Sequence, residues 1–346
     1  MYIQFLSHII SLLSIIFVHL ESFADGAPVG VCYGRVGNNL PPPTAVVGLL
    51  QANGIQNVRL FDADAATLRS FASTGISLMI DIPNESLPSI ASGTANSTVD
   101  WLISNVFSHI PPSQVRYLAV GPEAFVRDAF YTPYVVPAIT NLHGALQSVG
   151  LAGRIKISSP QPISVMSGFY PPSSAHFDPL IKPAMIPLLQ FLRDSGSPLM
   201  VNLYPYEVYV SHSNRIPLEY ALFKADAEFG DSGLMYDNLL DASIDAFVHA
   251  MEREGFQGIR VVVAETGWPT ACGEAAGVDN ALTYNDNVVR RAVNGVGTPK
   301  RPKEEMEVYM FDLFDENERG GDEYQKHFGI FSLAGVKLYD LRFSSN

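Results

Sequence analysis

Short apolar runs rich in β-branched residues alternate with longer amphipathic segments along a chain of 346 residues. Apolar strands of this kind are typical of parallel sheets that are buried on both faces. The expected strands are Val29–Tyr33, Asn57–Phe61, Ser77–Ile82, Val115–Gly121, Ile155–Ser159, Leu199–Leu203, Ile259–Ala264 and Glu307–Phe314. The expected helices are Thr44–Asn53, Val99–His109, Val135–Val149, Pro179–Asp194, Leu234–Glu254 and Asp279–Asn294.

Eight strands that alternate with helices, without a break in composition, predict an α/β fold with a single closed (β/α)8 TIM barrel. A doubly wound open sheet is the alternative. That fold usually carries a G-x-G-x-x-G phosphate fingerprint after its first strand, and the segment Gly34–Pro41 lacks it. The barrel is therefore favoured, and catalytic residues are expected at the carboxyl ends of its strands.

The first residues resemble a targeting segment. Phe5–Leu20 is almost entirely apolar, and Ser22-Phe23-Ala24 follows with the small-x-small pattern of a cleavage site. We predict a signal peptide over residues 1–24 and a single barrel domain over residues 25–346. An uncleaved membrane anchor is the alternative. The expected protein is soluble and secreted.

The charge balance limits the partners of the chain. Its 22 Lys and Arg against 35 Asp and Glu leave a formal charge of −13. That charge argues against nucleic acid and against an anionic membrane surface, and it favours a neutral polymer as substrate. The His residues are scattered, without metal-ligand spacing, so we expect no metal and no cofactor. A monomer is expected.

Cys32 and Cys272 are the two cysteines of the chain. Cys32 lies in an apolar strand and is expected to be a buried thiol, with a Cys32–Cys272 bridge as the alternative. Asn84 and Asn96 begin glycosylation sequons, and the second lies in the more loop-like surroundings.

Two carboxylates follow apolar strands and lie close to Pro, Gly or Trp residues. The fourth strand leads into Pro122-Glu123, and the seventh leads into Glu265-Thr266-Gly267-Trp268-Pro269. A helix cap or an ion pair with Arg is the structural alternative for either residue alone. At the same end of one barrel, Glu123 and Glu265 together are better explained as a catalytic pair.

Paired carboxyl groups over an uncharged substrate are what glycoside hydrolysis requires. One group stays protonated and gives its proton to the departing oxygen. The other is ionised and attacks the anomeric carbon. Their surroundings must therefore shift the two pKa values in opposite directions.

These segments resemble the acid/base and nucleophile signatures of glycoside hydrolase family 17, the plant β-1,3-glucanases. The resemblance covers nearly the whole chain after the targeting segment. It also includes Gly30–Gly34, Val58–Asp62, Pro83–Glu85, Asn202–Tyr206, Phe314–Asn317 and Phe328–Phe331. It implies a (β/α)8 barrel that hydrolyses internal bonds of β-1,3-glucan with retention of configuration. It also implies that the secreted protein is directed to the cell wall or apoplast, with the vacuole as the alternative.

The resemblance assigns the acid/base to Glu123 and the nucleophile to Glu265. It implies supporting roles around the sugar for Tyr33, Asn202, Tyr204, Glu307 and Glu316. Packing at the barrel mouth or helix capping is the alternative for each of these supporting residues.

Two aromatic residues near these signatures could also contact the sugar. Trp268 and Tyr206 are candidates for stacking on sugar rings, with packing into the barrel core as the alternative.

Two positions depart from the family pattern. Pro122 stands where the family usually has Asn before the acid/base, and proline has neither a side-chain donor nor a backbone N–H. The alternative function is therefore a β-1,3-glucan-binding protein with weak or lost catalysis. Glu207 stands where an apolar or aromatic residue is common, so altered linkage choice, such as mixed β-1,3/1,4-glucan, is a third possibility.

Overall fold

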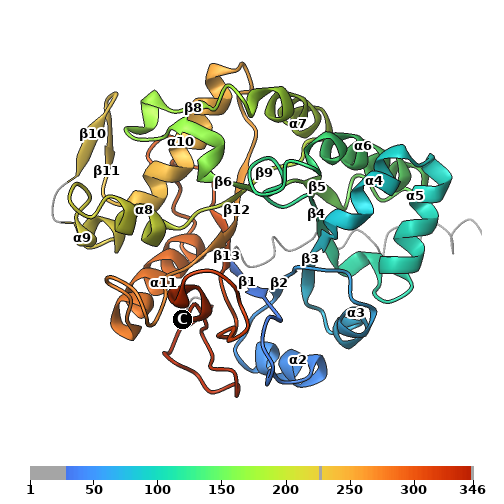
Figure 1. Cartoon of the computed structure of the whole chain (residues 1–346), viewed down its shortest axis with the longest axis horizontal. Coiled ribbons are helices and arrows are strands. Elements are labelled where there is room, and N and C mark those ends of the chain that lie inside the picture. Colours follow the sequence, from blue (N-terminus) through green and yellow to red (C-terminus); the bar gives the residue numbers. More distant parts are fainter. Residues whose placement is uncertain (1–28, 226–227, 344–346) are drawn as a thin grey trace, which may run out of the picture.

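The computed structural model describes residues 29–225 and 228–343, so the predicted signal peptide lies outside the described residues. A curled parallel sheet occupies the centre, and helices surround it (Figure 1). The strands of this sheet are β1 Val29–Tyr33, β2 Asn57–Leu60, β3 Ser77–Ile82, β4 Val115–Val120, β5 Lys156–Ser158, β6 Gln161–Pro162, β9 Leu199–Asn202, β12 Val261–Thr266 and β13 Glu307–Met310.

The sheet closes on itself as a barrel. Its order is β5-β4-β3-β2-β1-β13-β12-β9-β6, and every pairing is parallel. The two strands at its ends, β5 and β6, are consecutive in the chain, with only Ser159 and Pro160 between them. They therefore act as one interrupted strand, because proline cannot donate a hydrogen bond to the ladder. The predicted single (β/α)8 barrel is confirmed.

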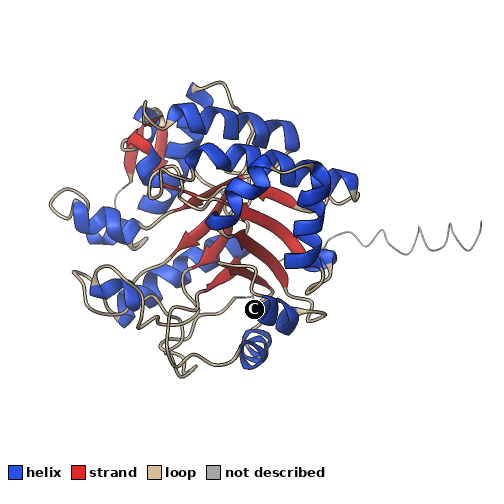
Figure 2. Cartoon of the chain, turned by 45° about the vertical axis from the view of Figure 1, so that its right-hand side comes forward, coloured by secondary structure: helices blue, strands red, loops and turns tan. Residues whose placement is uncertain are grey.

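Helices cover the outer face of the barrel (Figure 2). They are α2 Pro43–Ala52, α3 Ala65–Phe71, α4 Leu87–Ser92, α5 Ala95–Leu102, α6 Thr132–Ser148, α7 Lys182–Ser195, α8 Pro205–Ser211, α9 Leu218–Ala221, α10 Leu239–Arg253 and α11 Val278–Val293. Side-chain caps begin three of the described helices, α3, α5 and α10. At α5 the Thr94 side chain accepts from the N–H of Ser97 at 3.2 Å. Asp64 accepts from the N–H of Thr67 at 2.8 Å before α3, and Asn238 accepts from the N–H of Asp241 at 2.8 Å before α10.

Most expected elements differ from the structure by a few residues at one or both ends. The predicted helix Leu234–Glu254 begins only at Leu239, because Leu234–Tyr236 forms strand β11 of a hairpin with β10 (Phe229–Asp231). The Asn238 cap explains where the helix starts. The predicted strand Glu307–Phe314 ends at Met310. A second small hairpin pairs β7 (Met166–Gly168) with β8 (His176–Phe177).

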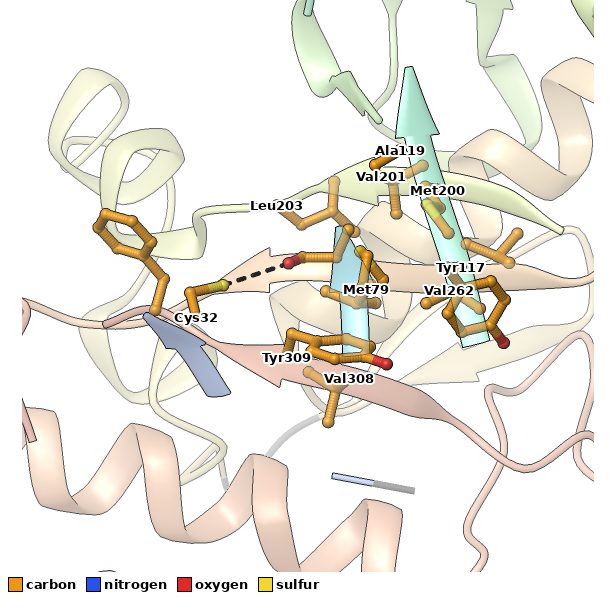
Figure 3. Close-up of a cluster of buried hydrophobic side chains, with 14 of the residues drawn as sticks. Cys32, Met79, Tyr117, Ala119, Met200, Val201, Leu203, Val262, Val308 and Tyr309 are labelled. Atoms are coloured by element: carbon orange, nitrogen blue, oxygen red, sulfur yellow. Dashed lines mark hydrogen bonds between the residues drawn. The ribbon is translucent and has the colours of Figure 1, made fainter. Parts of the chain in front are cut away.

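The barrel interior is a packed core. Figure 3 shows buried side chains from β1, β3, β4, β9, β12 and β13 lying against one another. Met79, Tyr117 and Tyr309 fill much of this space, as expected of a small barrel that is not a pore. Cys32 joins this cluster, and its thiol donates to the carbonyl oxygen of Ala264 at 3.5 Å. A functional pocket must therefore lie at an end of the barrel.

Among the described residues, no helix has both the length and the apolar character needed to span a bilayer.

Candidate active site

A cavity of about 210 Å³ lies at the carboxyl ends of the barrel strands. Residues that follow or end β4, β9 and β12 contribute to it, which is the end where TIM-barrel enzymes carry their active sites. Its lining residues are Arg59, Phe61, Pro122, Glu123, Arg127, Asn202, Tyr204, Glu207, Glu265, Phe311, Arg319, Gln325 and Phe328. The predicted carboxylate pair, Glu123 and Glu265, lines this one cavity.

Glu123 lies in the turn after β4. The backbone there is left-handed, with φ of 60° at Gly121 and 56° at Glu123. The N–H of Glu123 donates to the carbonyl oxygen of Pro160 at 2.8 Å, so the interruption between β5 and β6 anchors this turn. The Glu123 side chain is thereby directed into the cavity.

Two groups hold the Glu123 carboxyl, which is 7% exposed. Asn202 Nδ2 donates to its Oε1 at 2.7 Å, and Arg127 forms an ion pair with its Oε2. Burial, followed by the neighbouring charge of Glu265, raises the pKa of Glu123 above its usual value, while Arg127 and Asn202 oppose this increase. A carboxyl group with a raised pKa is suited to donate a proton.

Glu265 is the penultimate residue of β12 and is 8% exposed. Arg59 Nη1 donates to its Oε1 at 2.8 Å, and the hydroxyl of Tyr204 donates to its Oε2 at 2.7 Å. Burial and the Glu265 charge raise the pKa of Tyr204 well above its usual value, so the hydroxyl keeps its proton and remains a donor. Both Glu265 oxygens thus face donors that stabilise a carboxylate.

Arg59 supplies the positive charge beneath this site. It lies in β2, is fully buried, and pairs with Asp81 of β3 through Nε at 3.0 Å and Nη2 at 2.8 Å. Burial disfavours its charge, but the carboxylates of Asp81 and Glu265 outweigh burial and raise the pKa of Arg59. Arg59 was not among the predicted site residues, although an arginine inside the apolar run Asn57–Phe61 is the kind of signal that could have identified it.

Asn202 connects the two carboxyl groups. Its amide nitrogen donates to Glu123, and its oxygen accepts from Arg59 Nη1 at 3.3 Å, the same nitrogen that contacts Glu265. Glu123 and Glu265 are therefore connected through Asn202 and Arg59 in one hydrogen-bonded network. Their environments differ: Glu265 is held by a buried cation, whereas Glu123 contacts an amide and a cation that is 70% exposed.

Asn202 and Tyr204 line the cavity, as the family resemblance implies, while Tyr33 and Glu316 are not among its lining residues. Tyr33 is buried and packs on Phe71 and Phe314, with ring centroids 6.4 and 6.1 Å away.

Glu316 accepts from the N–H of Val36 at 2.8 Å and forms an ion pair with Arg319, which does line the cavity. Any Cβ at Gly34 would collide with carboxyl oxygens of Glu316 and Asp312, so glycine is required where these acids converge.

Glu307 lies at the other end of the barrel. It is the first residue of β13, and in a parallel barrel the first and last residues of a strand lie at opposite ends. Its carboxylate accepts from Arg116 at 2.9 Å, Tyr117 at 2.9 Å and Arg260 at 3.4 Å. The predicted position of Glu307 near the sugar must therefore be corrected.

Trp268 and Tyr206 occupy the core rather than the cavity wall. Trp268 is fully buried, and its indole N–H donates to the carbonyl oxygen of Ala275 at 3.0 Å. Tyr206 packs against it with ring centroids 5.1 Å apart. The structure therefore supports the alternative for these two rings, which is packing in the core and not stacking on a sugar.

Several cavity residues were not predicted as site residues. Phe61, Phe311 and Phe328 supply apolar surface, and Arg127, Arg319 and Gln325 supply polar groups. Arg127 and Arg319 lie on loops, and Gln325 lies in the short 3-10 helix Glu323–Lys326. No periodic pattern distinguishes a cavity residue from a solvated one in such segments. Both positions that depart from the family pattern, Pro122 and Glu207, line the cavity.

The described residues contain no group of three or more His, Cys, Asp and Glu side chains arranged to hold a metal ion. Cys32 and Cys272 are both free thiols, the first buried and the second exposed, so the alternative of a bridge between them is not realised. The sequon residue Asn96 is exposed in the first turn of α5.

The chain is similar to known proteins over most of its length. A model of the family described as glycosyl hydrolases family 17 matches residues 29–343. A glucan endo-1,3-beta-glucosidase of Vitis vinifera is 40% identical over 332 residues, which cover 95% of this chain and 95% of that relative. Glucan endo-1,3-beta-glucosidase 12 of Arabidopsis thaliana is 39% identical over 338 residues, 95% of this chain. The chain spans only 63% of the length of this second relative.

A solved structure agrees with these sequence relatives. CJP38, a beta-1,3-glucanase and allergen of Cryptomeria japonica pollen, superposes with a TM-score of 0.88 at 40% identity. The match covers 92% of this chain and 99% of that chain.

Proposed function

The chain belongs to glycosyl hydrolases family 17, and we propose that this glycoside hydrolase cleaves internal β-1,3-glucosidic bonds of callose- or laminarin-type glucans with retention of configuration. The named relatives are glucan endo-1,3-beta-glucosidases, and the charge of −13 favours a neutral polymer over an anionic one. The proposal includes secretion of the protein, which depends on the targeting pattern of residues 1–24.

The reaction has two displacement steps. The Glu265 carboxylate attacks the anomeric carbon, and the bond to the glycosidic oxygen breaks as Glu123 gives that oxygen its proton. Glu123, now ionised, then takes a proton from water. The resulting hydroxide attacks the anomeric carbon, releases the Glu265 carboxylate and leaves Glu123 protonated again.

The observation that supports these roles is the difference between the two carboxyl environments. Arg59 and Tyr204 donate to Glu265 at 2.8 and 2.7 Å and stabilise the charge that a nucleophile needs. Burial and Glu265 raise the pKa of Glu123, which favours the protonated form that an acid needs. Carboxyl pairs with separated acidities are the recognised arrangement for this chemistry.

Replacement of each carboxylate tests the roles. We expect Glu265→Gln to abolish the release of reducing ends from laminarin, because the amide cannot form the glycosyl-enzyme bond. We expect Glu123→Gln to reduce the rate by about 10²-fold or more, because proton transfer to the leaving group is lost. Glu307→Gln is the matched control, since Glu307 lies at the opposite end of the barrel and its loss should act on stability alone. Parent-like activity in both Glu123 and Glu265 variants would exclude this assignment.

A second candidate function is supported by Pro122, which lines the cavity beside Glu123 without a donor group. In this alternative the chain binds β-1,3-glucan and turns it over slowly or not at all. A product time course on laminarin, run beside a binding isotherm on the same oligosaccharides, separates the two functions. Tight binding without product favours the binding protein.

The linkage preference is a separate question, raised by Glu207 at the cavity wall. A carboxylate at this position changes which sugar hydroxyls can be bound. Parallel assays on curdlan, laminarin and mixed β-1,3/1,4-glucan measure that preference directly.

A further inference from the structure

Arg127 is a charged side chain at the cavity for which the two-carboxylate reaction has no role. It lies four residues after Glu123, in the loop between β4 and α6, and its Nε contacts Glu123 Oε2. Its N–H donates to the Glu123 carbonyl oxygen at 2.9 Å, so the same turn supplies both residues. The Arg127 side chain is 70% exposed although it lines the cavity.

The two oxygens of Glu123 are both engaged. Oε1 accepts from Asn202, and Oε2 contacts Arg127. A general acid must bring one oxygen within hydrogen-bond distance of the glycosidic oxygen, so one of these partners has to yield when glucan binds.

Burial decides which partner yields. Asn202 is 3% exposed and is held from its other side by Arg59, so its movement would disturb a buried network. Arg127 is largely in solvent, and an exposed ion pair contributes little to stability, so its displacement costs little.

We propose that Arg127 is a positioning residue for the acid/base: its guanidinium holds the Glu123 carboxyl and gives way to the sugar on the leaving-group side of the bond. This inference rests on the proposed function for its catalytic meaning. Arg127 touches neither the anomeric carbon nor the nucleophile in this scheme. It acts through Glu123, and its charge sets the pH range over which Glu123 works as an acid.

The groups that face Glu123 define the expected pH effect. Glu265 of β12 and burial favour its protonated form, whereas Arg127, Asn202 of β9 and Arg59 of β2 favour its charged form. Loss of Arg127 therefore raises the pKa of Glu123 further. Because kcat/KM falls when the acid of the free enzyme loses its proton, the alkaline limb of the profile moves to higher pH.

The first experiment compares the full chain with Arg127→Gln and Arg127→Lys on laminarin oligosaccharides. For Arg127→Gln, we expect the ratio of kcat/KM at about pH 8 to that at about pH 5 to increase by about threefold or more, with KM unchanged or lower. Lysine retains the charge and should restore most of the parent profile. Arg290→Gln is the matched control, because Arg290 forms an i,i+4 ion pair with Asp286 and is 65% exposed. It should reproduce the parent profile.

Two outcomes would overturn the inference. A KM increased several-fold in Arg127→Gln with an unmoved alkaline limb would make Arg127 a sugar-binding residue. An equal shift in Arg290→Gln would make the effect a general one of net charge.

A second variant tests whether Glu123 and Glu207 share the charge of Arg127. Glu207 of α8 also faces Arg127, whose charge favours the ionised form of Glu207 against burial. Glu207→Gln leaves Arg127 with Glu123 alone and removes a nearby negative charge. The alkaline limb should then move to lower pH, opposite to Arg127→Gln. If the alkaline limb moved in the same direction for Arg127→Gln and Glu207→Gln, the result would contradict the sharing of Arg127 by Glu123 and Glu207.

A readout without turnover separates this inference from the proposed function. Carbon-13 NMR of the full chain with labelled glutamate side chains follows the titration of Glu123, assigned by its loss in Glu123→Gln. A higher Glu123 pKa in Arg127→Gln supports the inference even if the parent hydrolyses no glucan, in which case the proposed function alone fails. An unchanged Glu123 titration overturns the inference even if the parent is fully active.

Discussion

At the scale of single residues, a buried arginine and a side-chain amide determine how the two carboxyl groups differ. Arg59 donates hydrogen bonds to Glu265 and Asn202 from inside the barrel, and Asn202 in turn donates to Glu123. Removing one member of a buried charged network leaves the others without compensation, which is far more costly than loss of an exposed pair. The site is therefore an extension of the barrel core.

Pro122 is the residue whose replacement we expect to increase hydrolytic activity. We expect Pro122→Asn to raise kcat/KM on laminarin, by up to about 10²-fold, because an added side-chain donor can hydrogen-bond the sugar in the transition state. Initial rates of reducing-end release measure the effect. Pro122→Ala is the control, since it frees the backbone without adding a donor. Equal gains in both variants would show that loop freedom, rather than the hydrogen bond, limits the parent chain.

At the scale of elements, the turn after β12 depends on an aromatic core that supports the cavity from behind. Trp268 packs on Tyr206 and Tyr284, with ring centroids 5.1 and 5.5 Å away. Because Trp268 follows Glu265 by three residues, its burial restricts the end of the strand that carries this carboxylate. The aromatic residues of this segment thus contribute to the site through packing.

Trp268→Ala distinguishes packing from sugar stacking. We expect it to lower the free energy of unfolding by about 3–5 kcal/mol, the usual cost of removing a large buried side chain. Urea unfolding measures this loss, and laminarin-oligosaccharide affinity should be retained at temperatures where the variant is folded. Trp101→Ala is the matched control, because Trp101 is only partly buried and its loss should cost less. A stable Trp268→Ala chain with weakened glucan binding would instead place the indole against sugar.

At the scale of the whole molecule, buried acids couple stability to pH. Burial raises the pKa of Asp241 to about 7, against the opposing effects of Arg291 and Asn238. Burial also raises the pKa values of Asp312 and Asp81. Asp241 therefore keeps its proton in the folded chain at a pH where the unfolded chain has lost it.

The sign of the pH dependence follows from this difference in bound protons. Between about pH 4 and pH 7 the folded state holds more protons than the unfolded state, so stability declines as pH rises through the folded pKa of Asp241. We expect Tm to be lower at about pH 8 than at about pH 5. Asp241→Asn should remove about 1–3 kcal/mol of that change, because the amide mimics the protonated acid. Asp286→Asn, at a surface ion pair, should leave the slope unaltered, and a slope unaffected by Asp241→Asn would exclude this group as its source.

Much of the architecture could be predicted from the chain because the signals were local. β1 and β3 have the predicted bounds, and the other predicted strands differ by a few residues at one or both ends. Apolar runs and amphipathic periods depend on residues that are close in sequence, so they can be recognised without knowledge of the fold. The helix expected over Leu234–Glu254 was too long because its first residues pair with Phe229–Asp231, a partner that periodicity does not identify.

The residue order alone was enough to indicate a parallel α/β barrel and to single out Glu123 and Glu265, since each follows an apolar strand and breaks its pattern. Folding was needed to sort their neighbours: Asn202, Tyr204 and Arg59 meet the carboxylates, whereas Glu307 lies at the far end of the barrel and Trp268 lies in its core. The physical reason is that strand order and register, which are long-range properties, determine which side chains share a cavity. The network through Arg59, with partners on β3, β9 and β12, exists only after the barrel has closed.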